Sequence, residues 1–105
     1  MKKKIKFLLD YECSPIWVYE NEDLIYNGLP AEFVNDDKFR NIVDKIQNVY
    51  ETLFENTEIS FVYKGFSNSK ERKEFLIMVE QCITMLNEKA EKNYEVVVDF
   101  DASII

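Results

Sequence analysis

Residues 7–37 read FLLDYECSPIWVYENEDLIYNGLPAEFVNDD, a stretch with eight carboxylates, five aromatic residues after Phe7, and no lysine or arginine. Around its start, in residues 4–13, the odd-numbered side chains are apolar and the even-numbered ones are mostly charged. This alternation predicts a half-buried strand. Ser14-Pro15 ends the strand, because proline cannot donate a hydrogen bond to a neighbouring strand.

The second half of the stretch predicts a β-hairpin. Residues 16–19 and 24–26 are rich in β-branched and aromatic side chains, which favour strands. Between them, Glu20-Asn21-Glu22-Asp23 suits a four-residue turn. Asn27-Gly28 then marks the exit from the hairpin, towards a loop or single helical turn at residues 31–34.

The segment after residue 34 predicts a long helix and then a strand. Asn35 or Asp36 can cap the helix and place a negative charge at its positive end. Apolar residues recur at three- and four-residue spacing from there to Glu55, as expected for an amphipathic helix. Residues 58–64 alternate again and predict a strand, which Gly65 closes.

A second long helix is predicted over residues 70–89, with Cys82 on its buried stripe, and a last strand over residues 94–100. Two amphipathic helices need an apolar sheet to cover. The predicted fold class is therefore α+β: a single domain over residues 1–105, in the order β-β-β-α-β-α-β. Its sheet is mostly antiparallel, and the two long helices pack on one face.

The other face of this sheet is predicted to be open. If Ile16 and Val18 point inward, Trp17 and Tyr19 point outward. The strand alternation adds to the open face Leu8, Asp10, Glu12, Ser60, Val62, Glu95, Val97 and Asp99. A patch of Trp, Tyr and Val bordered by carboxylates is typical of a protein interface. The alternative is that Trp17 packs beneath the loop at residues 29–34 as ordinary core.

Composition limits the class of protein. The chain has 105 residues, 47% of them hydrophobic, and a net charge of −7, which suits one folded acidic domain. Such a surface repels nucleic acid and attracts a basic protein partner. The apolar run at residues 7–9 is too short for an export signal, and no segment is long enough to span a membrane. We expect a cytoplasmic protein with no membrane partner, whose Cys13 and Cys82 are reduced.

The sequence predicts no enzyme. It contains no histidine, so Cys13 and Cys82 lack the usual activating base. The hairpin acids have no lysine near them in the sequence, as a metal-dependent nuclease often requires. Gly28 and Gly65 lie outside any phosphate-binding motif. We expect no cofactor and no metal site.

The remaining prediction is a binding protein that neutralises a basic partner. Carboxylates on a stiff scaffold can fill a toxin active site that is built to hold phosphates, as in a nuclease. We expect the charges to come from the hairpin tip, with two further acids beside it, and three aromatic residues to anchor the contact. The predicted partner-binding residues are Asp10, Glu12, Trp17, Tyr19, Glu20, Glu22, Asp23 and Tyr26.

In its small size, its acidity and the stretch LLDYECSPIWVY at residues 8–19, the chain resembles the immunity proteins of bacterial polymorphic and contact-dependent toxin systems. The resemblance implies a non-catalytic role and one cognate toxin. Two alternatives stay open. One is a phage-encoded mimic of nucleic acid that inhibits a host defence nuclease. The other is a homodimeric assembly module that pairs through the open face or the strand at residues 94–100.

Overall fold

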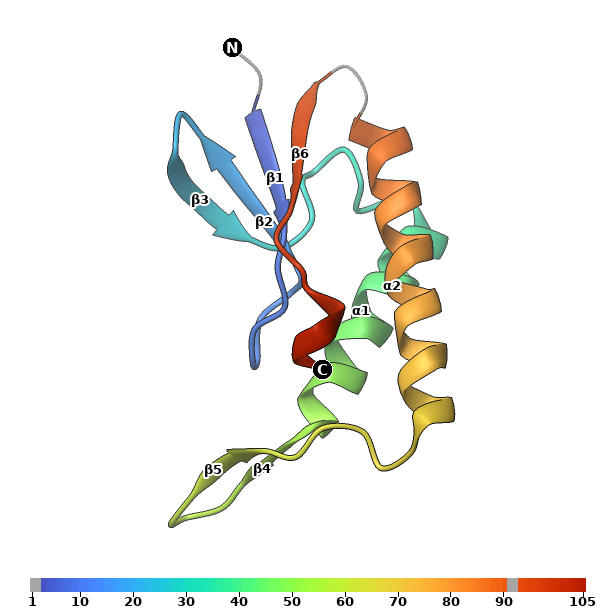
Figure 1. Cartoon of the computed structure of the whole chain (residues 1–105). Helices are drawn as coiled ribbons and strands as arrows, with labels where there is room; N and C mark the ends of the chain where they lie inside the picture. Colours follow the sequence, from blue (N-terminus) through green and yellow to red (C-terminus); the bar gives the residue numbers. More distant parts are fainter. Residues whose placement is uncertain (1–2, 91–92) are drawn as a thin grey trace.

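The computed structural model describes residues 3–90 and 93–105, and its elements follow the order βββαββαβ with a final 3-10 turn (Figure 1). They are β1 (Lys3–Phe7), β2 (Ile16–Glu20), β3 (Asp23–Asn27), α1 (Asp37–Thr52), β4 (Phe54–Asn56), β5 (Phe61–Tyr63), α2 (Ser69–Ala90), β6 (Tyr94–Val98) and η1 (Ala102–Ile104). The α+β class is confirmed, with β4 as an additional strand. Residues 1, 2, 91 and 92 of the predicted domain lie outside the described residues.

The main sheet has four strands in the order β3-β2-β1-β6. The pairs β1–β2 and β2–β3 are antiparallel, whereas β6 pairs with β1 in parallel. Figure 1 shows both helices on one side of this sheet. The predicted inward residues of β1 and β2 are all buried there: Ile5, Phe7, Ile16 and Val18.

The core lies between this face and the two helices. It receives Phe39, Val43 and Ile46 from α1 and Phe75, Val79, Cys82, Leu86 and Ala90 from α2. The prediction that Cys82 is a core residue is confirmed, and its burial raises the pKa of the thiol to about 12. The predicted N-cap of α1 is also confirmed, because the Asp36 side chain accepts a hydrogen bond from the Phe39 amide.

The first strand ends earlier than predicted, at Phe7 instead of Cys13. Ile16 lies opposite Phe7 in the antiparallel pair β1–β2, so the chain must reverse its direction between them. The reversal includes a turn in which the Cys13 amide donates to the Asp10 carbonyl, and Glu12 adopts a φ of 58°. Residues 8–13 therefore form a loop despite their alternation. The prediction that Leu8, Asp10 and Glu12 lie on the open face of the sheet is wrong.

The strand predicted at residues 58–64 does not join the main sheet. Its central part, β5, pairs with β4 in a separate two-stranded hairpin that projects from the end of α1 (Figure 1). The helix ends at Thr52 and not at Glu55, and Phe54 begins β4, where its ring stacks on the Phe61 ring with centroids 5.2 Å apart. The prediction that Ser60 and Val62 lie on the open face is therefore wrong.

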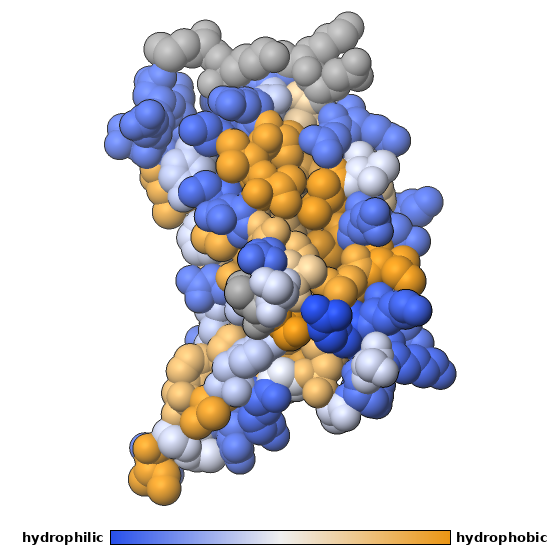
Figure 2. Space-filling model, in the orientation of Figure 1, coloured by the Kyte–Doolittle hydropathy of each residue, from blue (hydrophilic) through white to orange (hydrophobic). Residues whose placement is uncertain are grey.

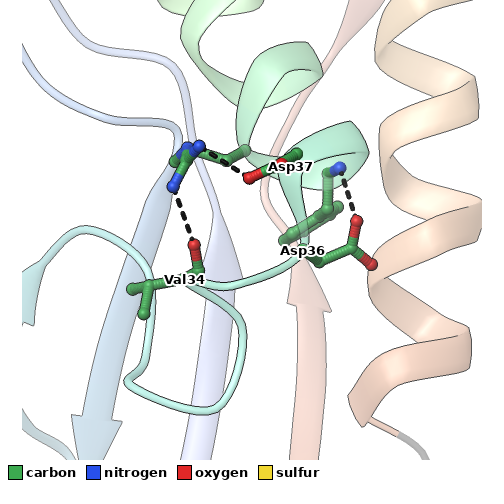
Figure 3. A network of polar contacts seen from close by, with 5 residues as sticks. Val34, Asp36 and Asp37 are labelled. Carbon is green, nitrogen blue, oxygen red and sulfur yellow. Dashed lines mark hydrogen bonds and ion pairs between the residues drawn. The ribbon is translucent and has the colours of Figure 1, made fainter.

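Polar contacts hold the segment before α1 in place. Figure 3 shows Lys89, at the end of α2, paired with the Asp36 carboxylate. It also shows the Arg40 guanidinium donating to the Val34 carbonyl and to Asp37. In the same segment, the Tyr94 hydroxyl donates to Glu32 at 2.7 Å. These contacts join both helices and β6 to the loop that leaves the β2–β3 hairpin.

Two of these contacts predict a loss of stability in acid. Hydrogen bonding to Lys89 lowers the pKa of Asp36, and the Tyr94 hydroxyl lowers the pKa of Glu32. The stability from a carboxyl with a depressed pKa is complete above its unfolded pKa and is lost as pH falls through its folded pKa. We expect the free energy of unfolding, measured in urea, to fall below about pH 4.

The control for this prediction is the Asp36→Asn/Glu32→Gln double variant. Its amides do not titrate, so its free energy of unfolding should fall less between about pH 4 and pH 2. Equal losses in the variant and the wild type would show that these two carboxyls do not cause the acid sensitivity.

Candidate functional site

The tip of the β2–β3 hairpin carries three exposed carboxylates: Glu20, Glu22 and Asp23. The turn is shorter than predicted, because β2 ends at Glu20 and β3 begins at Asp23. Asn21 and Glu22 form it with φ values of 58° and 88°, in the left-handed region that two-residue hairpin turns require. The three charges therefore lie close together at a projecting end of the sheet.

β3 is an edge strand, and all five of its residues are exposed. Leu24, Ile25 and Tyr26 are 49%, 46% and 40% exposed, respectively. The Tyr26 hydroxyl donates to the Leu29 carbonyl at 3.1 Å, which orients the ring. An exposed apolar edge beside a charged turn is suited to contact with another protein.

Trp17 and Tyr19 lie on the face of the sheet that the helices do not cover, opposite the buried side chains of Ile16 and Val18. Both are partly exposed. The Trp17 indole donates to the Leu8 carbonyl at 2.9 Å. The predicted outward orientation of both residues is confirmed.

The centre of the open face is basic. The residues predicted for that face included no lysine. Lys4 lies between Tyr19 and Glu95 in the sheet, and Lys6 lies between Trp17 and Val97. The Lys6 ammonium is 4.0 Å from the Asp99 carboxylate and 5.4 Å from the centroid of the Tyr19 ring. The lysines of β1 therefore separate the acidic parts of the surface.

Asp10 and Glu12 do not lie beside the hairpin tip. Because β1 and β2 are antiparallel, their turn follows the Phe7–Ile16 end of the pair, whereas Glu20 lies at the other end of β2. The predicted site is thus divided: one group of carboxylates lies at each end of β2, and Trp17 lies between them.

A second aromatic surface was missed by the sequence reasoning. The Tyr11 ring contacts Phe54 and Phe61, with centroids 5.0 and 4.7 Å apart, and Tyr50 and Tyr63 also pack on Phe54. One signal could have indicated it: residues 46–63 contain three glutamates and no lysine or arginine. The structure brings this stretch against the similarly base-free residues 7–37.

A groove of about 810 Å³ lies between the end of α1 and the first half of α2. Apolar residues such as Val49, Phe66 and Met78 line it, together with charges of both signs, including Lys45 and Glu74. This mixture does not match the acidic surfaces described above.

Within residues 3–90 and 93–105, no three side chains of the Cys, Asp and Glu types converge to hold a metal ion. Cys13 and Cys82 are free thiols. The pKa of Cys13 is raised, mainly by partial burial and to a smaller extent by the negative charge of Asp10. None of the helices in the described part of the chain is long and apolar enough to cross a membrane.

A family model described as Serratia CdiI immunity protein-like matches residues 3–100. No curated protein matches the chain.

Proposed function

We propose that this chain, which belongs to the Serratia CdiI immunity protein-like family of non-catalytic inhibitors of cognate contact-dependent inhibition toxins, neutralises a toxin that is a basic nuclease domain. The chain binds that domain directly in the cytoplasm and blocks its active site. The family membership favours this function over a phage inhibitor or an assembly module.

The observation that supports a basic target is the group of three exposed carboxylates at the β2–β3 tip, within a stretch that has no lysine or arginine. A nuclease active site is lined with cations that hold phosphates. Carboxylates accept charge-assisted hydrogen bonds from the same lysine and arginine side chains. Glu20, Glu22 and Asp23 therefore occupy phosphate positions in the complex.

The other proposed contact residues follow β2 away from the tip. Tyr19 packs against the toxin on the open face next to the charged turn, because Tyr side chains often anchor protein interfaces. Tyr26 pairs with the inward-facing Val18, so it contacts the toxin at the exposed edge of β3 and not on the open face. Trp17 lies on the same strand, and Asp10 and Glu12 provide a second acidic contact at its far end. The toxin thus contacts the two ends of β2, with Lys4 and Lys6 of β1 between the two acidic contacts.

We expect the purified chain to bind the cognate toxin domain, expressed from the neighbouring gene, with an affinity that falls as salt is raised from about 50 to about 500 mM. Isothermal titration calorimetry measures this dependence. One equivalent of the chain should also stop cleavage of DNA or RNA by the toxin. An affinity that does not change with salt would contradict the electrostatic contact, and a toxin that cleaves neither nucleic acid would contradict the nuclease target.

A further inference from the structure

We propose that residues 54–63, here called the aromatic hairpin, form a second docking surface that inserts into an apolar cleft with a basic rim on the cognate toxin. This inference rests on the proposed function, because the partner is the same toxin. It assigns the desolvated part of the contact to β4 and β5, away from the charged tip of the β2–β3 hairpin.

The aromatic hairpin exposes apolar side chains to an unusual degree. Ile59 in its turn is 94% exposed, and Phe61 and Val62 on β5 are 53% and 49% exposed. Figure 2 shows hydrophobic atoms at the projecting end of this hairpin. Exposed apolar side chains gathered on one projecting element indicate a protein-binding site more than an ordinary surface.

The hairpin is held rigidly at its base. A two-stranded hairpin alone is only marginally stable in water, but here the Phe54 ring packs against Tyr11 and Tyr50, with centroids 5.0 and 5.2 Å away. The amides of Lys64 and Gly65 both donate to the carbonyl of the buried Leu53. A preformed element loses little conformational entropy on binding, so its apolar contacts contribute more to affinity.

Charge identifies the partner. Glu51, Glu55 and Glu58 lie in residues 46–63 with no lysine or arginine among them, and contact with Tyr11 adds the turn that carries Asp10 and Glu12. These two stretches place five carboxylates around the hairpin, against two nearby bases: Lys64, directly after β5, and Arg72, whose charge acts on Tyr63. Such a surface is complementary to a basic protein, whereas a second copy of this chain would bring like charges together.

The position of the hairpin fits a single partner. In Figure 1 it lies below the main sheet and points to the lower left, away from α2, whereas the turn of the β2–β3 hairpin lies at the upper left. The turn that carries Asp10 and Glu12 lies against its aromatic rings. A toxin domain on the open face would thus meet the charged tip at one end and the aromatic hairpin at the other.

The test compares two substitutions of similar exposure. Val62 on the aromatic hairpin is 49% exposed and Ile77 on α2 is 50% exposed, and each is replaced by lysine. We expect Val62→Lys to weaken binding to the purified toxin domain at least 10-fold, and Val62→Lys/Ile59→Lys about 100-fold. Ile77→Lys should stay within about twofold of wild type. Biolayer interferometry measures these affinities, and most of the loss should be in the dissociation rate.

The outcomes separate the two proposals. Failure of the wild type to bind the toxin overturns the proposed function, and this inference with it. Tight binding by the wild type and equally tight binding by the double variant overturns the docking surface alone. A wild-type dimer that the double variant dissolves, seen by light scattering, also overturns it, because the hairpin then serves self-association. Unchanged circular dichroism melting shows that each variant is folded.

Discussion

Replacing Glu20, Glu22 and Asp23 together by lysine is expected to weaken binding to the cognate toxin domain by about 1,000-fold, equivalent to about 4 kcal/mol. The three carboxylates are exposed at one turn, so the substitutions change the charge that the toxin meets without disturbing the core. They also place like charges opposite the cations of the toxin active site. Both the association rate and the salt dependence should change, as stopped-flow measurements over a salt series would show.

The control is a triple variant with the same change in net charge on the helical side. Glu74, Glu80 and Glu88 are exposed on α2, away from the β2–β3 hairpin. Their replacement by lysine should weaken binding only modestly, by about 10-fold or less, through the long-range field. Equal losses in the two triple variants would mean that net charge, and not the hairpin, attracts the toxin.

The regular elements of this fold were predictable because their signals are local. The apolar stripe of α2 recurs from Phe75 to Ala90, and its buried members are those that the three- and four-residue spacing indicates. The N-cap at Asp36 needs only a side chain and an amide three residues apart. The β2–β3 turn is likewise set by neighbouring residues, so the position of its acids at the tip of a hairpin could be predicted.

The errors arose where partners are distant in the sequence. Residues 8–13 alternate as a strand does, but the pairing of Phe7 with Ile16 forces them into a loop. Phe54 continues the apolar spacing of α1, yet its ring stacks on Phe61, beyond the turn. Alternation shows that residues 58–64 form a strand and does not show which strand they join.

The candidate site depended on these same pairings. The distance between Asp10 and Glu20 follows from the antiparallel register of β1 and β2. The periodic pattern of apolar residues in the sequence does not determine that register. The aromatic hairpin was missed because its contacts join Tyr11 to Phe54 and Phe61 across the chain. Its composition was visible in the base-free residues 46–63, but only the fold brings that stretch to residues 7–37.

The substitution Phe39→Ala is expected to reduce the free energy of unfolding by about 3–5 kcal/mol. Phe39 is fully buried in the first turn of α1, where its ring contacts Phe33 with centroids 6.0 Å apart. Its truncation leaves a cavity between the helices and the loop before α1, which contains Phe33. For a domain whose total stability is about 5–15 kcal/mol, this loss is large. Urea titration followed by circular dichroism measures it.

Phe61→Ala is the matched control, because it removes the same atoms from a side chain that is 53% exposed on the aromatic hairpin. The free energy of unfolding should fall by only about 1 kcal/mol, because the substitution removes only the ring contacts with Tyr11 and Phe54. A loss as large as that of Phe39→Ala would make the hairpin part of the core. A small loss of stability together with a large loss of toxin affinity means that the Phe61 ring serves the contact with the toxin.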